Sequence, residues 1–215
     1  MPSVFLPATA EDCFNAARMF LNDNGIPTQL WTDAILLPMM KQAHLELQVK
    51  LKQRASPAMR GYQTVTLVPL EIDLIPLPVD LVLPIKLWEK PAGSPAPAFQ
   101  PMTETDMLPF VLPSTTLTYW MWDQDAILFV GATIATDVFV DYWRRVPVPV
   151  AATDDVGILE GEQFLGPRIA AIAAGSVGEE NTSSIANALA ETQLQVVLAA
   201  NKSRAAQAPG VSLNP

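Results

Sequence analysis

Cysteine and histidine are almost absent, because the chain of 215 residues contains one of each, Cys13 and His44. A single cysteine excludes a disulfide framework and fits a protein made in a reducing cytoplasm. Transition-metal sites normally use several His or Cys ligands, so we expect no such metal. Both residues fall within expected helices, where packing explains them better than nucleophilic or acid–base chemistry. We therefore predict that the protein is not an enzyme and needs no cofactor.

Charge is also scarce. Only 16% of the residues are Asp, Glu, Lys or Arg, and the formal net charge is −9. This balance argues against a surface that grips nucleic-acid phosphates, whereas an acidic surface lets DNA pass without adhering. Hydrophobic residues make up 50% of the chain. Some apolar surface is therefore expected to meet a partner, with a large, well-filled monomer core as the open alternative.

Signals of export or membrane insertion are missing as well. The N-terminus lacks the basic start and apolar centre of a signal peptide. The longest apolar stretch, 126–143, is interrupted by Asp137 and Asp141 and is rich in β-forming residues. It therefore predicts β-sheet and not a membrane span.

The N-terminal quarter has helical periodicity. A first helix is expected over 9–24, with Thr9 as its N-cap and Asp12 in a capping-box position. A second is expected over 32–54, where Pro38 either kinks the helix or marks its start. Both segments place apolar residues at helical spacing, so each is expected to bury one face.

The C-terminal part is predicted to be helical too. An Ala-rich helix is expected over 160–174, with Pro167 as a kink or a later start. The last helix is expected over 182–200, capped by one of Thr182, Ser183 and Ser184. Its predicted apolar face consists of Ile185, Ala188, Leu189, Val196 and Ala199. Residues 206–215 have few apolar anchors and are expected to form a flexible tail.

Between these helical parts the periodicity is that of strands. Strands are expected over 62–68, 85–89 and 136–146, and a hairpin joins 117–122 to 126–130. Several prolines between 69 and 84 favour short edge strands and turns.

This order of elements predicts an α+β fold. Two N-terminal and two C-terminal helices are expected to form one helical bundle with an inserted antiparallel β block. The predicted helical domain comprises residues 1–60 and 151–205, and the predicted β domain comprises 61–150.

Two acidic groups are the remaining candidates for chemistry. One could supply oxygen ligands to a structural metal such as calcium, and its members are Asp154, Asp155, Glu160 and Glu162. Its spacing matches no known calcium loop, and acids at a helix start stabilise the helix dipole. Asp123 and Asp125 could form the carboxylate pair of a hydrolase. Both lie at the tip of the expected hairpin, where Asp suits turn geometry.

Aromatic residues gather in the β block, at Trp88, Tyr119, Trp120, Trp122, Tyr142 and Trp143. Few cations are interleaved with them, so core packing or a subunit interface explains them better than base stacking. A carbohydrate-binding module built on these aromatics is the alternative function. The residues proposed for interactions are Trp120, Trp122, Tyr142 and Trp143, together with Val211 and Leu213 in the tail.

Three segments carry a family resemblance. They read PVDLVLPIKLWE at 78–89, LTYWMWDQDAILFVGAT at 117–133 and VFVDYW at 138–143. In this order, and followed by an Ala-rich helix pair, they resemble the head–tail adaptor (connector) proteins of short-tailed and related tailed bacteriophages. The resemblance extends over roughly 9–204.

The resemblance implies a structural virion protein without catalytic residues. It implies a ring of about twelve copies in the neck, beneath the portal protein and around the DNA exit channel. The helices are then expected to pack against neighbouring copies and the portal, and the β part to lie outward or toward the next tail or nozzle component. The implied location is the virion neck, after assembly in the host cytoplasm.

Overall fold

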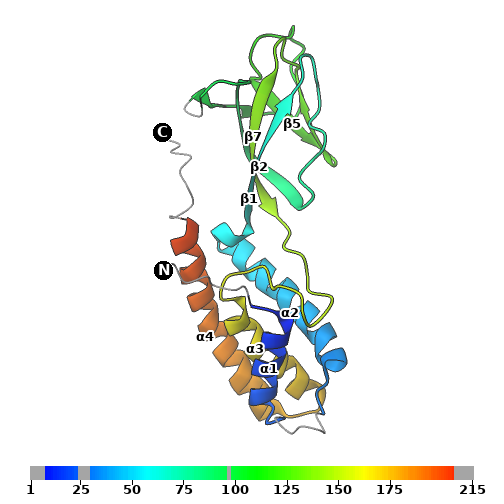
Figure 1. Ribbon diagram of the computed structural model, residues 1–215, viewed down its shortest axis with the longest axis vertical. Helices are drawn as coiled ribbons and strands as arrows, with labels where there is room; N and C mark the ends of the chain where they lie inside the picture. The colour runs from blue at the N-terminus through cyan, green and yellow to red at the C-terminus, as the bar shows by residue number, and fades with distance from the viewer. Residues whose placement is uncertain (1–7, 24–29, 96–97, 206–215) are drawn as a thin grey trace. The chain divides into compact units, whose positions relative to one another are not determined.

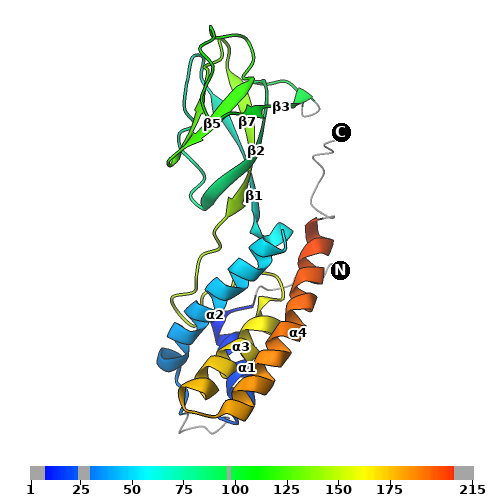
Figure 2. The same cartoon turned by 180° about the vertical axis from the view of Figure 1, so that it is seen from behind.

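The computed structural model describes residues 8–23, 30–95 and 98–205, so the predicted tail at 206–215 lies outside the described residues (Figure 1). The described residues divide into two compact units. The helical unit contains those up to Met59 and those from Val146 onward, and the β unit is Arg60–Arg145. Along the described sequence, the N-terminal helices precede a block of strands and the C-terminal helices follow it (Figures 1 and 2). The predicted α+β class is confirmed.

Helix α1 (Ala10–Phe20) begins with a capping box, as predicted. The Thr9 hydroxyl oxygen accepts a hydrogen bond from the Asp12 backbone N–H at 3.4 Å, and the Asp12 carboxylate accepts one from the Thr9 backbone N–H at 2.8 Å. These hydrogen bonds favour the carboxylate and lower the pKa of Asp12. The helix buries Cys13, Phe14 and Ala17, and it ends earlier than the predicted limit at residue 24.

Helix α2 (Asp33–Gln53) has Thr32 at its N-cap position and closely matches the predicted range. Pro38 lies inside the helix and not at its start. Its inward face is apolar and consists of Leu36, Met40, Ala43, Leu47 and Leu51. A short 3₁₀ turn, Pro57–Met59, follows the helix and leads to the β unit.

Helix α3 (Gly161–Ser176) is the central helix of the helical unit, since it packs against α1, α2 and α4. It is rich in alanine and glycine, which lets its neighbours approach closely. A Cβ atom at Gly166, for example, would lie 2.7 Å from the Cβ atom of Ala16 in α1. Pro167 lies inside this helix, so the carbonyl of Gln163 lacks its usual i+4 donor.

Helix α4 (Glu180–Ala205) differs from its prediction at two points. It begins before Thr182, and the Ser183 hydroxyl donates to the carbonyl oxygen of Ala171 at 2.8 Å instead of capping the helix. The predicted apolar face is wrong as well, because Ile185 is 69% and Val196 46% exposed. The buried face consists of Ala186, Ala190, Leu194, Val197 and Leu198. This buried face combines two alanines with three larger apolar residues, and it lies on the opposite side of the helix from the predicted face.

The β unit contains two sheets, with strand orders β1-β7-β2-β3 and β4-β5-β6. The strands are β1 (Arg60–Leu67), β2 (Leu81–Pro91), β3 (Gln100–Pro101), β4 (Thr103–Glu104), β5 (Tyr119–Asp123), β6 (Ala126–Phe129) and β7 (Thr136–Arg144). All pairs are antiparallel except β4–β5, which is parallel. Strand β2 is longer than predicted, and its register against β7 is irregular beside Pro84. Both sheets contribute to one core, which contains Leu87, Trp120, Ile127, Phe129, Val138 and Val140.

Candidate interaction surfaces

His44 is buried and serves as a structural clamp. Its Nε2 atom lies 2.9 Å from the carbonyl oxygen of Val156, and its Nδ1 atom lies 3.0 Å from Nε2 of Gln48. A donor at Nε2 and an acceptor at Nδ1 satisfy both contacts, which corresponds to the neutral imidazole. Burial lowers the pKa of His44, and the hydrogen bond to Val156 opposes this shift. Both ring nitrogens are therefore engaged in hydrogen bonds within the helical unit.

Cys13 is fully buried on the inward face of α1. Burial raises the pKa of its thiol strongly, and the charges of Glu162 and Asp12 raise it further. A thiol that stays protonated and shielded from solvent behaves as a small apolar side chain.

The acidic group near Asp154 organises its own loop. The Asp154 carboxylate accepts hydrogen bonds from the backbone N–H groups of Val150 at 2.8 Å and Ala151 at 2.9 Å. The Asp155 carboxylate accepts one from the N–H of Gly157 at 2.6 Å. Throughout the part of the chain that the structure describes, no three His, Cys, Asp or Glu side chains are placed to hold a metal ion.

The second acidic pair lies at the tip of the β5–β6 hairpin. Asp123 is opposite Ala126 in the register, so the turn consists of Gln124 and Asp125. Gln124 has a φ of 53°, a left-handed conformation that this tight turn requires. Asp123 and Asp125 are exposed. Their position is accounted for by the turn geometry.

The aromatic residues proposed for interactions occupy different environments. Trp120 is only 1% exposed and belongs to the core of the β unit. Tyr142 is 5% exposed, and its hydroxyl donates to Asp80 at 2.8 Å; burial and this contact raise the pKa of Tyr142 to about 12. Packing within the unit accounts for both residues.

The other proposed aromatics keep some accessible surface. Trp122 is partly buried against the core, and Trp143 lies 5.5 Å below the guanidinium group of Arg60. That guanidinium also contacts the carboxylate of Asp141, and this contact raises the pKa of Arg60. An interaction role for Trp122 and Trp143 stays a prediction. Val211 and Leu213 lie outside the described residues.

The β unit exposes apolar side chains along two connecting segments. Phe110 is fully exposed, and its neighbour Leu112 is 89% exposed. A hollow of about 210 Å³ lies beneath this segment, lined by Val111, Leu112, Ser114, Thr116, Thr118, Tyr119 and Val130. The second segment exposes Val68, Leu70, Ile72, Ile75 and Val79, and the adjoining start of β2 exposes Val82 and Leu83. Apolar surface of this extent is characteristic of a protein that is covered by a partner.

The helical unit has an apolar ridge along α2. We call it the α2 ridge, and it consists of Ile35, Pro38, Gln42, Leu45 and Val49, all of them exposed. The spacing of three to four residues places these side chains on the face of α2 that points away from α3. Lys52 is exposed and lies three residues after Val49, at the C-terminal end of the ridge. Within the described structure it takes part in no ion pair. The sequence prediction identified only the opposite, buried face of this helix.

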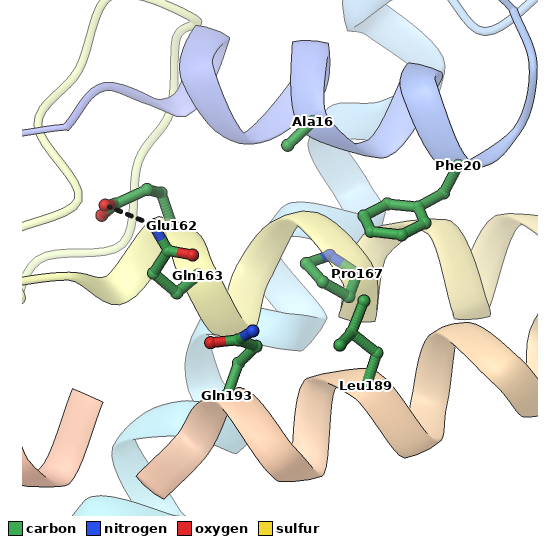
Figure 3. A pocket seen from close by; sticks show the side chains of 7 residues that line it. All are labelled: Ala16, Phe20, Glu162, Gln163, Pro167, Leu189 and Gln193. Carbon is green, nitrogen blue, oxygen red and sulfur yellow. Dashed lines mark hydrogen bonds between the residues drawn. The ribbon is translucent and has the colours of Figure 1, made fainter. Parts of the chain in front are cut away.

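A groove lies between α1 and α4, with α3 as its floor (Figure 3). This α1–α4 groove has a volume of about 150 Å³ and is lined by Ala16, Phe20, Glu162, Gln163, Pro167, Leu189 and Gln193. Ile185 and Val196 extend its apolar surface along α4, since they lie four residues before and seven after Leu189. Burial and the neighbouring charge of Glu160 raise the pKa of Glu162. Figure 3 shows α2 behind α3, so the ridge and the groove lie on opposite sides of the central helix.

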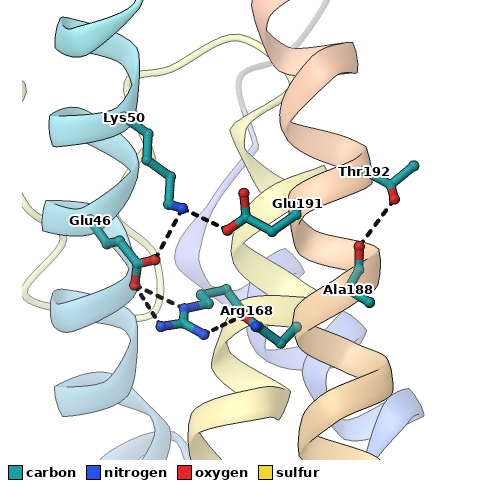
Figure 4. Close-up of polar contacts among 7 residues, drawn as sticks. Glu46, Lys50, Arg168, Ala188, Glu191 and Thr192 are labelled. Carbon is teal, nitrogen blue, oxygen red and sulfur yellow. Dashed lines mark hydrogen bonds and ion pairs between the residues drawn. The ribbon is translucent and has the colours of Figure 1, made fainter.

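Ion pairs hold α2, α3 and α4 at a fixed level relative to one another (Figure 4). Arg168 of α3 contacts Glu46 of α2 at 2.8 Å, and Lys50 of α2 contacts Glu191 of α4 at 2.6 Å. Arg168 also donates to the Asn187 side chain at 2.5 Å. The C-terminal part of α2 is therefore level with the middle of α4.

Three findings bear on the identity of the chain. Among the described residues, no helix has both the length and the apolar character needed to cross a bilayer. No curated protein matches the sequence. The family model of the SU10 adaptor protein matches residues 8–212, nearly the whole chain. The chain therefore belongs to the SU10 adaptor protein family, and its role is that of a structural phage adaptor.

Proposed function

We propose that copies of this chain form the adaptor ring of a phage neck, which joins the portal protein to the tail and surrounds the DNA exit channel. The observation that carries the proposal is the exposed apolar surface on both units. Phe110 and Leu112 in the β unit, and Ile185 in the helical unit, are largely solvent-exposed in the single chain. Contacts with neighbouring copies, the portal and the next tail or nozzle protein would remove this surface from water.

Net charge supports a channel wall. The chain carries 22 acidic and 13 basic residues, so a ring of many copies has a strongly negative surface. DNA repelled by such a surface moves past without sequence-specific contact. The protein is in this view a virion component without catalytic activity, assembled in the host cytoplasm with about twelve copies in each ring.

Mixing the purified chain with the portal protein of the same phage tests the proposal. Electron microscopy and native mass measurement are expected to show a ring of copies on one face of the portal. Failure to bind the portal, together with failure to form any ring, would contradict it. A glycan screen of the single chain, with Trp122→Ala as control, tests the alternative of a carbohydrate-binding module. Specific sugar binding that this substitution abolishes would favour that alternative.

A further inference from the structure

The helical unit carries two apolar faces that differ in shape. The α2 ridge is convex, because it is the outer face of a single helix, and the α1–α4 groove is concave. Helix α2, whose outer face is the ridge, and the groove lie on opposite sides of α3 (Figure 3). A surface that pairs with an identical copy of itself gives a two-fold dimer, whereas two unlike, complementary surfaces give a head-to-tail contact that closes into a ring.

The charges at the two faces are complementary. Lys52 borders the ridge, and Glu162 is half-buried at the groove beside Glu160. The Lys50–Glu191 ion pair places Lys52 level with Gln193, which lines the groove together with Glu162. A rotation about an axis along the bundle keeps these levels aligned between neighbouring copies. The ammonium group of one copy then reaches the carboxylate of the next.

We propose that the occupant of the α1–α4 groove is the α2 ridge of a second copy of this chain, in a head-to-tail contact that repeats around the ring. The contact places Leu45 and Val49 of one copy against Ile185, Leu189 and Val196 of the next. Lys52 pairs with Glu162 at the edge of this contact. This inference rests on the proposed ring and specifies which surfaces build it.

Engineered cysteines test the contact directly, because the native Cys13 is fully buried and does not compete for reagent. Leu45→Cys lies on the ridge and Ile185→Cys lies beside the groove, and both native side chains are exposed. The assembled complex of full-length chain and portal is treated with a short bismaleimide. The double variant is expected to give a ladder of cross-linked species up to the complete ring. Each single variant is expected to remain uncross-linked, because neither position meets its own copy.

Two results would overturn the inference. One is cross-linking of the Leu45→Cys variant to itself, which indicates a self-complementary dimer. The other is absence of cross-linking in the double variant while electron microscopy shows intact rings, which indicates that the ring uses other surfaces and leaves the proposed function standing. Absence of rings with the wild-type chain instead contradicts the proposed function, and the inference falls with it.

Charge exchange gives a second, independent measurement. Lys52→Glu alone and Glu162→Lys alone are each expected to weaken ring assembly by about tenfold, and the combined variant is expected to recover it. Circular dichroism checks that all three variants fold. Recovery shows that the two residues meet across the contact. Equal loss in the combined variant would overturn this pairing.

Discussion

The imidazole of His44 and the backbone carbonyl of Val156 are 2.9 Å apart, although 112 positions separate them in the sequence. Gln48 completes the contact, because its side-chain amide donates to Nδ1 of His44 and to the carbonyl of Val146, while its oxygen accepts from the N–H of Val146. The segment from Val146 to Val156, which follows the β unit, is thereby hydrogen-bonded to α2 at both of its ends. The helical unit depends on this attachment, because only the returning segment leads into α3.

Replacing His44 by alanine is expected to destabilise the helical unit by about 2–3 kcal/mol, since the Val156 carbonyl and Gln48 lose their buried partner. Urea denaturation followed by circular dichroism measures this. An effect below about 0.5 kcal/mol, the level of ordinary surface substitutions, would contradict the assigned clamp.

The same site predicts an acid-dependent loss of stability. Burial lowers the pKa of His44 below its ordinary value of 6.5. The stability that neutral His44 contributes is therefore fully present above pH 6.5. It decreases as the pH falls toward the folded-state pKa, because the unfolded chain binds the proton first. Wild-type chain is expected to lose more stability between pH 7.5 and pH 5.5 than His44→Gln, which has no imidazole to titrate. Identical pH profiles for the two proteins would refute the prediction.

Glu89 in β2 gives the opposite dependence on pH. The side chain is 4% exposed, and its Oε2 atom has no hydrogen-bond partner within the described structure. Burial raises the pKa of this carboxyl, and a hydrogen bond from the Leu117 backbone opposes the shift in part. Stability contributed by the protonated form is thus present below pH 4.5 and is lost as the pH rises through the folded-state pKa.

Glu89→Gln keeps the shape of the side chain and removes the charge. We expect the β unit to gain about 1 kcal/mol at pH 7 and little at pH 4, measured by urea denaturation at both values. A gain of equal size at both pH values would show that ionisation of Glu89 is not the cause.

Two glycines of α3 form a matched pair for testing how closely this helix is packed. A Cβ at Gly166 would lie 2.7 Å from Cβ of Ala16, whereas the nearest atom to a Cβ at Gly175 is the Ser183 hydroxyl oxygen at 3.3 Å. Gly166→Ala is expected to destabilise the helical unit by about 1–3 kcal/mol. Gly175→Ala is expected to cost less than 1 kcal/mol or to stabilise, because alanine favours the helix. Thermal denaturation of both variants gives the comparison, and a larger loss for Gly175→Ala would contradict it.

Assembly and folding can be separated by placing a charge on the exposed apolar faces. Leu45→Asp on α2 and Val196→Asp on α4 are expected to leave the unfolding free energy within about 0.5 kcal/mol of wild type, because both native side chains are substantially exposed. Both variants are expected to fail in ring assembly with the portal, as seen by electron microscopy. Val177→Asp is the control, since Val177 is 60% exposed but lies on neither face. Equal loss of rings in the control would show that any added charge disrupts assembly.

Local signals in the sequence predicted much of this fold. Thr9 and Asp12 are three residues apart, and that spacing alone specifies the capping box of α1. The β5–β6 hairpin was likewise predictable, because its signal lies in two short strands and the turn between them. Elements whose determinants are this close together need no knowledge of tertiary contacts.

Predictions that depend on a distant partner were less successful. Helix α4 has apolar residues on two faces, and contact with α3 decides which face is buried, so periodicity alone selected the exposed side. Trp120 and Trp122 are two residues apart in one strand, but Trp120 is in the core and Trp122 is only partly buried. This difference in burial depends on how the sheets pack, which local sequence does not show. The α2 ridge had a visible signal, because Ile35, Leu45 and Val49 are apolar residues that do not share the helical spacing of the buried face. Two apolar faces on one helix indicate a second packing partner.

The β unit begins and ends on neighbouring strands. Arg60, the first residue of β1, is paired with Trp143 near the end of β7. The chain therefore enters and leaves this unit at points about 5 Å apart, the spacing between adjacent strands. An insertion with adjoining ends can be exchanged as a cassette without altering the scaffold that receives it. Exchange of the β unit therefore leaves its two points of attachment on the helical unit, Met59 and Val146, unchanged.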